Sequence, residues 1–181
     1  MQLIDLTEQK RLETELRLLA FEDPLTRLPN RRLLMDRLEQ ALRLCKRRGT
    51  LGAVLYIDLT KFKQLNDAHG HAVGDQWLVE VATRLVHAVR ETDTVARIGG
   101  DEFVVLLEGL GPERDRAAAR AAEVAAKIRS GLGEAFVVGA IRHRGSASIG
   151  LRLLGGEDQD AESILREADR SMYAEKRGRA G

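Results

Sequence analysis

The chain has 181 residues, of which 44% are hydrophobic, and its 29 Lys and Arg residues nearly balance its 28 Asp and Glu residues. This length supports one well-buried domain with a helical appendage rather than two ordinary domains. The net charge of +1 gives no electrostatic reason to expect a nucleic acid or an anionic membrane surface as a partner, so neither is predicted.

A single cysteine, Cys45, excludes an internal disulfide and a thiolate metal site, which fits a reducing compartment. It lies on an apolar helix face and is interpreted as part of the core. No run reaches the length of a membrane span, and no signal-peptide pattern opens the chain. We therefore expect a cytoplasmic location for these residues, in a longer parent protein that could itself be anchored in a membrane.

Residues 5–21 are predicted to form a polar helix capped by Asp5 or Thr7. Its apolar residues follow the four-then-three spacing of a coiled-coil seam, at Leu12, Leu16 and Leu19. Because the helix is too short to be stable alone, it either packs on the domain or pairs with a second copy as a signalling helix. We expect residues 1–21 to be a linker helix and residues 22–181 to form the main domain.

Apolar periodicity and turn residues predict the other elements. Asn30 caps a helix that ends at Gly49, and Asp160 caps the last helix. Between them we expect, in chain order, a strand at 52–58, a short helix from Phe62, a loop framed by Gly70 and Gly74, a helix at 76–90, strands at 94–98 and 103–108, a helix at 113–129, and strands at 136–141 and 146–153 joined by residues 142–145. The pattern is α+β, with helices covering a largely antiparallel central sheet.

The stretch from Arg97 to Phe103 reads Arg-Ile-Gly-Gly-Asp-Glu-Phe. Its two glycines supply backbone freedom for a hairpin turn and let the main chain approach a ligand closely, and two carboxylates follow at once. Taken alone, a pair of glycines between apolar segments is typical of an ordinary hairpin. A second acidic strand end upstream changes that interpretation.

This second acid is Asp58, which ends the apolar strand 52–58. If the strand pairs antiparallel with residues 103–107, Asp58 and Asp101 converge. Two nearby carboxylates repel unless a cation lies between them, and magnesium is the cation that suits oxygen ligands and phosphate substrates. The sequence therefore predicts chemistry on a nucleotide.

The segment that follows Asp58 offers a cation, an amide and a carboxylate. Lys63 and Asn66 share one side of the predicted short helix, and Asp75 comes after the second glycine of the loop. Each of these residues, taken singly, is also typical of a solvated helix and a capped turn. Their combination favours a binding site.

The stretch Arg97 to Phe103 resembles the signature of the GGDEF-domain diguanylate cyclases. The resemblance covers most of the chain, because similar motifs occur at residues 23–32, 58–75 and 148–150. It implies a palm-like fold related to nucleotidyl cyclases and polymerases, preceded here by the signalling helix. It further implies the condensation of two GTP molecules into cyclic di-GMP with release of pyrophosphate, by two GGDEF catalytic domains that face each other in a homodimer.

The resemblance also assigns roles to individual residues. It implies two magnesium ions, with manganese as an alternative, held by Asp58, the Leu59 carbonyl and Asp101. It makes Glu102 a metal ligand or a proton acceptor, and Lys63 a catalytic phosphate-neutralising group. It implies that the substrate is bound by Asn66, His71, Asp75, Gly99, Gly100 and Lys176.

Upstream of the signature, Arg90 and Asp93 match the arginine and aspartate of the family's inhibitory site, where the product cyclic di-GMP binds. Out of this context such a pair is usually a local salt bridge. Two positions depart from the commonest family pattern, since Arg27 stands where glycine is frequent and Thr60 where aspartate is frequent. Arg179, near the C-terminus, is one residue out of the usual spacing for a phosphate ligand.

An alternative from another class is a catalytically silent module. Such a domain binds GTP or cyclic di-GMP and regulates an adjoining phosphodiesterase domain of the EAL type. We also expect the chain to be a fragment, because it ends before a short strand that often follows in the family.

Overall fold

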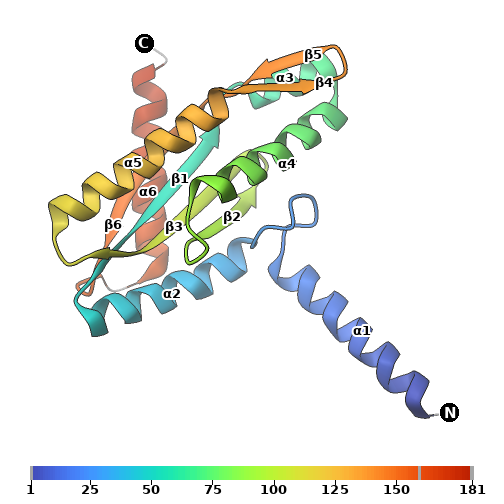
Figure 1. The fold of residues 1–181 in the computed structure, drawn as a ribbon, viewed down its shortest axis with the longest axis horizontal. Helices are drawn as coiled ribbons and strands as arrows, with labels where there is room; N and C mark the ends of the chain where they lie inside the picture. The colour runs from blue at the N-terminus through green and yellow to red at the C-terminus, as the bar shows by residue number, and fades with distance from the viewer. Residues whose placement is uncertain (1, 159, 180–181) are drawn as a thin grey trace.

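The computed structural model describes residues 2–158 and 160–179; for residues 2–5 and 179 the backbone alone is described. Helices and strands are arranged around one central sheet (Figure 1). The elements, in chain order, are α1 (Gln2–Phe21), α2 (Arg31–Arg48), β1 (Leu51–Leu59), α3 (Phe62–His69), α4 (His71–Ala88), β2 (Thr94–Gly99), β3 (Glu102–Gly111), α5 (Arg114–Gly133), β4 (Ala135–Val138), β5 (Ile141–Arg144), β6 (Ala147–Leu154) and α6 (Ala161–Arg179).

The central sheet has four strands in the order β2-β3-β1-β6, and every neighbouring pair is antiparallel. In the register of β1, Asp58 lies opposite Glu102 on one side and opposite Ser148 on the other. The predicted α+β class with a largely antiparallel sheet is confirmed. The pairing also brings the end of β1 beside the start of β3, as the sequence predicts.

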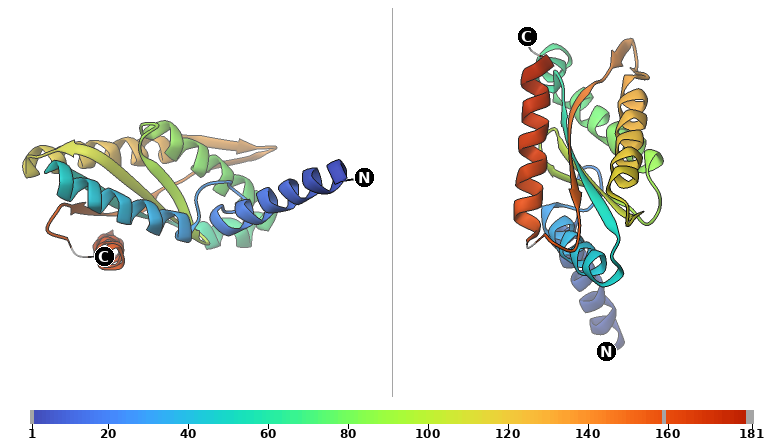
Figure 2. Two further views of the ribbon diagram at one scale, coloured as in Figure 1. Left: turned by 90° about the horizontal axis from the view of Figure 1, so that it is seen from below. Right: turned by 90° about the vertical axis from the view of Figure 1, so that its left-hand side faces the viewer.

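Helices cover both faces of this sheet. Alternate residues of β1 point to opposite sides, so Leu55 and Ile57 enter a core beneath α4 and α5, whereas Val54 and Tyr56 enter a second core beneath α2 and α6. Figure 2 shows the sheet between these two pairs of helices. A strand buried on both faces must be apolar throughout, which explains why β1 reads as an almost unbroken hydrophobic run.

Three predicted helix ends are confirmed by their hydrogen bonds. The Asn30 side chain accepts a hydrogen bond from the Leu33 N–H at 3.1 Å, and the Asp160 carboxylate accepts one from the Ser163 N–H at 2.7 Å. Gly49 ends α2 with φ 64°, a left-handed conformation that favours glycine. Short polar side chains and a glycine thus fix these ends, as the local sequence indicates.

Three other boundaries differ from the predictions. α1 begins at Gln2, so neither Asp5 nor Thr7 caps it. Gly70 alone separates α3 from α4, and Gly74 lies inside α4 rather than in a loop. The predicted single strand 136–141 turns back at Gly139, which has φ 57°, so the predicted connection 142–145 is largely β5.

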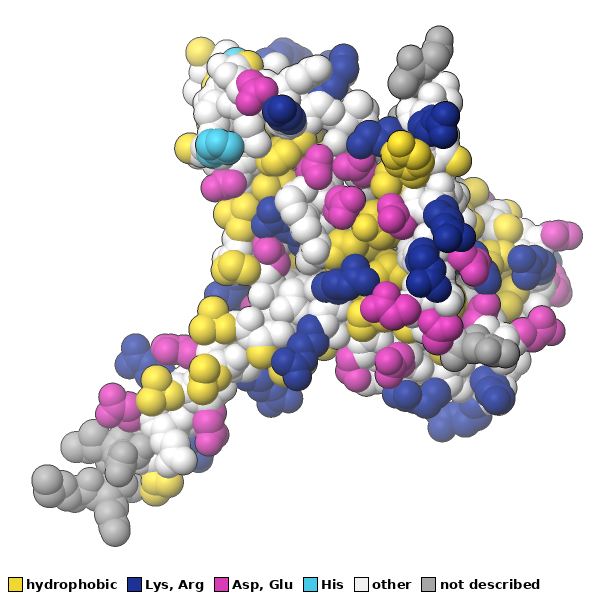
Figure 3. All heavy atoms as spheres, turned by 180° about the vertical axis from the view of Figure 1, so that it is seen from behind, with side chains coloured by type: hydrophobic (Ala, Val, Ile, Leu, Met, Phe, Trp, Pro, Cys, Tyr) yellow, Lys and Arg dark blue, Asp and Glu magenta, His cyan; other side chains and the backbone are white. Residues whose placement is uncertain are grey.

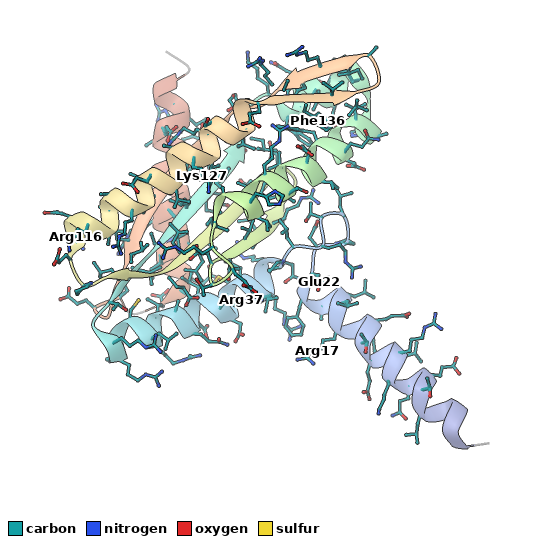
Figure 4. The ribbon with its side chains drawn as sticks, viewed as in Figure 1. Arg17, Glu22, Arg37, Arg116, Lys127 and Phe136 are labelled. Carbon is teal, nitrogen blue, oxygen red and sulfur yellow. The ribbon has the colours of Figure 1, made fainter. Side chains whose placement is uncertain are left out.

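The hairpin formed by β4 and β5 is a separate two-stranded sheet. Figure 4 shows Phe136 on this hairpin, which lies over α4. The Phe136 ring is 5.2 Å from the buried Trp77 ring, and the His143 ring meets the same indole edge-on at 5.0 Å. Trp77 therefore anchors the hairpin to α4.

α1 extends away from the rest of the molecule (Figures 1 and 4). Its leucines remain largely exposed, with 54% of Leu12, 66% of Leu16 and 72% of Leu19 accessible to solvent. The interpretation of α1 as a helix packed on the domain is therefore wrong for this part of the chain.

Over the described residues, no helix has the length and apolar character needed to cross a membrane.

Candidate active site

Two carboxylates from distant parts of the sequence meet at one end of the sheet. Asp58 is the second-last residue of β1 and is only 5% exposed, and Asp101 occupies the turn before β3. The Leu59 N–H donates a hydrogen bond to the Asp101 carbonyl at 3.1 Å, so the backbone holds the two residues together. Burial and the nearby Asp58 carboxylate both raise the pKa of Asp101. The predicted convergence is therefore present.

Glu102 joins the two aspartates because it pairs directly with Asp58 across β1 and β3. Its carboxylate accepts a hydrogen bond from the Tyr56 hydroxyl at 3.2 Å. Burial raises the pKa of Glu102, the bond from Tyr56 opposes this shift, and the Asp58 carboxylate adds to it. Acidic side chains gather on this face of the molecule between α6 and the end that carries α3 (Figure 3).

Lys176 supplies a positive charge to this acidic cluster. Its Nζ lies 2.5 Å from Oδ2 of Asp58, and this hydrogen bond raises the pKa of the lysine. α6 can bring the lysine so close because it packs directly on β6 at Gly150, where a Cβ would overlap the backbone of Ala168 and Met172. A residue predicted to bind phosphate thus neutralises a predicted metal ligand.

The residue beside it, Glu175, fixes this end of α6. Its carboxylate forms an ion pair with Arg129 of α5 at 2.6 Å and accepts a hydrogen bond from the Ile149 N–H of β6 at 3.3 Å. Since α5 and α6 cover opposite faces, the pair reaches around the edge strand β6. Lys176 therefore follows directly after a residue whose side chain is bound to both α5 and β6.

The glycine turn between β2 and β3 is open above its backbone. Neither Gly99 nor Gly100 has a positive φ. The turn therefore does not need glycine for its backbone conformation, contrary to the prediction. A Cβ on Gly100 would meet nothing within 4 Å, and one on Gly99 would meet only the Glu102 side chain at 3.7 Å. The missing side chains leave space for a ligand to approach the main chain.

An ion pair braces this turn from the end of α1. The Arg97 guanidinium donates to both Asp23 oxygens at 3.1 Å and to the Gly100 carbonyl at 2.8 and 3.0 Å. Burial acts to raise the pKa of Asp23, but hydrogen bonds from Thr26 and Arg97 outweigh it and lower the pKa. A hollow of about 770 Å³ adjoins the brace and is lined by Leu19, Arg31, Ile98 and both glycines, among others.

The turn after Asp23 also explains one departure from the family pattern. Arg27 has φ 62°, a conformation that costs an ordinary side chain about 1–2 kcal/mol and glycine almost nothing. This is the position where the resembling family frequently has glycine. The arginine is exposed and forms an ion pair with Glu22 at 3.2 Å.

The predicted base-binding residues lie around the junction of α3 and α4. Asn66 is in the last turn of α3, and exposed His71 and Asp75 are in the first turns of α4. The Asn66 Oδ1 atom is buried and has no hydrogen-bond partner among the described residues. Lys63 is exposed and lies one turn before Asn66 on α3. Only two residues separate α3 from β1, the strand that carries Asp58.

Arg90 and Asp93 lie at the opposite end of β2 from the glycine turn. The Asp93 carboxylate accepts hydrogen bonds from the backbone N–H groups of Arg90 at 3.0 Å and Glu108 at 3.1 Å. The exposed Arg90 lines two hollows of about 340 and 280 Å³. The aspartate therefore shapes the turn and lines the smaller hollow, and the more exposed arginine lines both hollows.

The donor set at the sheet end fits a magnesium ion that also binds a substrate. Asp58 and Asp101 supply hard oxygen ligands, and a cation between them would relieve the repulsion that, after burial, raises the pKa of Asp101. Over the described side chains, no group of three or more His, Cys, Asp and Glu residues is placed to hold a metal ion by itself. Magnesium commonly binds one or two carboxylates and completes its shell with water and phosphate oxygens, which suits such a pair.

Sequence reasoning missed the contacts of three residues of this region, namely Tyr56, Asp23 and Arg97. Tyr56 and Arg97 act through partners 46 and 74 residues away, which local patterns do not reveal. Asp23 carries a local signal, because the spacing to Thr26 is that of a side chain that caps a turn. The side chain of Arg179 lies outside the described residues.

Comparison with known proteins identifies the family. Residues 20–181 match the model described as "Diguanylate cyclase, GGDEF domain". The bifunctional diguanylate cyclase/cyclic di-GMP phosphodiesterase MucR of Pseudomonas aeruginosa is 44% identical over 176 residues. The match covers 97% of this chain but only 25% of MucR, so the chain spans about a quarter of that relative.

Solved structures agree with this assignment. The isolated GGDEF domain of TpbB from Pseudomonas aeruginosa superposes with a TM-score of 0.81 at 38% identity and covers 87% of this chain and 89% of its own. The coiled coil and GGDEF domain of DgcB from Caulobacter crescentus, in complex with cyclic di-GMP, has a TM-score of 0.81 at 29% identity and covers 98% and 93%. The chain therefore belongs to the GGDEF domain family of diguanylate cyclases.

Proposed function

We propose that this chain is a diguanylate cyclase domain that condenses two GTP molecules into cyclic di-GMP and pyrophosphate. The observation that carries the proposal is the meeting of Asp58, Asp101 and Lys176 beside an open glycine turn. Buried Asp58 and half-buried Asp101 repel each other although Lys176 neutralises one of them, and a magnesium triphosphate supplies both further positive charge and oxygen ligands.

In this proposal Asp58, Asp101 and the Leu59 carbonyl hold two magnesium ions. When bound, the ions lower the pKa of the attacking 3′-hydroxyl and neutralise the triphosphate. Lys176 exchanges its Asp58 partner for a phosphate oxygen, and Lys63 neutralises charge that grows on the phosphates. The backbone at Gly99 and Gly100 lies against the nucleotide, where a side chain would obstruct it.

Asn66, His71 and Asp75 bind the base in the same proposal. The Asp75 carboxylate can accept from both N–H donors on the Watson–Crick edge of guanine, whereas adenine leaves it unpaired. A site built in this way can reject the wrong base by roughly 10⁴-fold. The buried oxygen of Asn66, which has no partner among the described residues, supports a polar ligand at this junction.

Glu102 is assigned to metal binding or to proton acceptance. Its raised pKa and its bond from Tyr56 are compatible with either role. Glu102→Gln separates them: a lost proton acceptor lowers kcat at saturating magnesium, whereas a lost ligand raises the magnesium concentration needed for half-maximal rate. A variant with unchanged rate and unchanged magnesium dependence would remove Glu102 from both roles.

Catalysis in this proposal requires two domains, because each holds one GTP. The exposed leucines of α1 are suited to pair with a second copy, and the DgcB fragment that aligns with 98% of this chain includes a coiled coil. α1 would then set the orientation in which the two GTP molecules face each other. We propose that dimerisation through the catalytic domains and α1 is part of the reaction.

We further propose that cyclic di-GMP inhibits the enzyme at Arg90 and Asp93. The guanidinium suits phosphate oxygens and faces open space, and Asp93 keeps the turn in shape. Bound product would lock the two domains in an orientation that separates their active sites. The site lies one length of β2 away from the glycine turn, so it acts on domain orientation rather than on the reacting groups.

The proposal is tested by incubating the purified chain with GTP and magnesium at several protein concentrations. Mass spectrometry should detect cyclic di-GMP, and the rate should rise more steeply than linearly with protein concentration until dimers saturate. ATP in place of GTP is the matched control. A sample shown to be dimeric that forms no cyclic di-GMP would contradict cyclase activity.

A second candidate is the silent regulatory module. The relation to MucR, which is named as both a cyclase and a phosphodiesterase, is the observation that favours it. This candidate predicts that GTP binds with measurable affinity, without turnover, and changes the activity of an adjoining phosphodiesterase domain. Binding without product in the same experiment would therefore select the module.

A further inference from the structure

The junction of α3 and α4 is a tight elbow made by one residue. Gly70 has φ 88° and donates its N–H to the Asn66 carbonyl at 2.8 Å, which closes the last turn of α3. The Gly74 N–H then returns to the Gly70 carbonyl at 3.3 Å and opens α4. Asn66 and Gly74 are thereby brought together from opposite arms of the elbow.

Gly74 is buried against the side chain of Asn66. A Cβ at this position would overlap Asn66 Oδ1 and lie 2.9 Å from Asn66 Cγ and 3.3 Å from Cζ of Phe62. Every one of these atoms belongs to a side chain, and the nearest is the end of a flexible one. An alanine is therefore compatible with the helix and the fold, but it forces the Asn66 amide to move.

The Asn66 amide is held in an unusual environment. Its oxygen is buried and lacks a hydrogen-bond partner among the described residues, whereas most buried polar atoms in proteins have one. Since no hydrogen bond within the described part of the chain holds this oxygen, its close approach to Gly74 is the contact that limits where it lies. The space that the glycine leaves free determines where the amide lies.

We propose that Gly74 is a positioning residue that sets the Asn66 amide for recognition of the guanine base. The inference rests on the proposed use of GTP, and it adds a residue that touches neither the base nor the phosphates. A side chain at position 74 pushes the amide away from the base and leaves Asp75 to bind it alone. The absence of a side chain thus contributes to substrate affinity.

The test is Gly74→Ala in the full chain, with Asn66→Ala and the double variant alongside. Gly74→Ala should raise KM for GTP and weaken binding of a non-hydrolysable GTP analogue by about 10-fold, the loss expected for one hydrogen bond. kcat should stay within about 2-fold. In the Asn66→Ala background the alanine should cost less than 2-fold, because the group it displaces is gone.

Gly131→Ala is the matched control. Gly131 is also inside a helix, α5, and a Cβ there would meet nothing within 4 Å. This variant should bind the analogue as the wild type does. Thermal unfolding of all variants shows whether each remains folded.

The outcomes separate the inference from the proposed function. If the wild type binds no guanine nucleotide, the proposed function fails and takes the inference with it. If the wild type binds and Asn66→Ala weakens binding, but Gly74→Ala binds normally, the inference alone is wrong. An equal loss from Gly74→Ala with and without Asn66 also overturns it, because the glycine would then act through the backbone.

Discussion

The two ends of β2 use aspartate in opposite ways. At the start of the strand, both oxygens of Asp93 accept backbone N–H groups, so the carboxylate is satisfied within the fold. At the other end, Asp101 lies beside Asp58, and burial together with this repulsion raises its pKa. Asp93 thus shapes the chain, whereas Asp101 faces a like charge that a bound cation would relieve. The neighbouring charge, rather than residue type, therefore distinguishes the structural aspartate from the candidate catalytic one.

The largest expected effect comes from Asp101→Asn. Removing a ligand of the proposed ions should lower cyclic di-GMP formation by about 10³-fold or more, since several kcal/mol of charge stabilisation are lost and each 1.4 kcal/mol is tenfold. Without magnesium the variant should be at least as stable as the wild type, because repulsion from Asp58 is relieved. Product formation and thermal unfolding measure the two effects, and retained turnover would falsify the metal assignment.

Lys176→Met tests the positive charge that pairs with Asp58. It should lower turnover by about 10²-fold through the lost phosphate contact, an order-of-magnitude value for one charged group. It should also destabilise the magnesium-free protein by about 1–3 kcal/mol, because buried Asp58 loses its 2.5 Å partner. Chemical denaturation with and without magnesium measures this loss. Full stability of the variant in the absence of magnesium would contradict the proposed exchange of partners.

At the start of β2, two variants should have different effects: Asp93→Ala should lower stability, and Arg90→Ala should change product inhibition. Asp93→Ala leaves two N–H groups without their acceptor, so it should cost about 1–3 kcal/mol of stability. Arg90→Ala should leave stability within about 0.5 kcal/mol, as is usual for exposed sites, and relieve product inhibition without lowering the initial rate. A cyclic di-GMP titration and a denaturation curve read out both. Unchanged inhibition in Arg90→Ala would count against the inhibitory site.

The smallest expected effect concerns pH. The folded-state pKa of Asp23 is lowered, so its contribution is present above the unfolded value near 3.8 and is lost as the pH falls through the folded value. Asp23→Asn should therefore destabilise the protein at pH 7 by about 1–2 kcal/mol, and the difference from wild type should disappear in strong acid. Denaturation curves across this range test it, and a constant difference at every pH would show that the charge plays no part.

Much of the fold follows from local residues. Asn30, Gly49 and Asp160 mark helix ends by themselves, and the apolar run before Asp58 indicates a central strand. Gly74 misled the prediction because a glycine signals a loop unless a side chain from elsewhere fills its place, and Asn66 does so here. Lys176 and Asp58 are 118 residues apart, so their contact depends on packing that no local pattern encodes.

Some features of the site follow from the family resemblance, and others are visible only in the structure. The metal-binding and base-binding roles came from motif similarity, and the structure brings Asp58, Asp101 and Glu102 together as those roles require. The roles of all these residues stay predictions, and for Lys63, His71 and Asp75 the structure adds only their places on α3 and α4. No local pattern predicts the ion pair between Asp23 and Arg97, which only the structure shows.

The ion pair of Arg129 and Glu175 has a consequence for how copies of the chain meet. β6 is an edge strand, and an exposed edge invites a strand from another molecule to add to the sheet. Glu175 already occupies the Ile149 N–H, and the two helices reach around the edge above it. The Ile149 N–H is therefore not available to an incoming strand, which makes sheet-to-sheet pairing at this point of the β6 edge unfavourable.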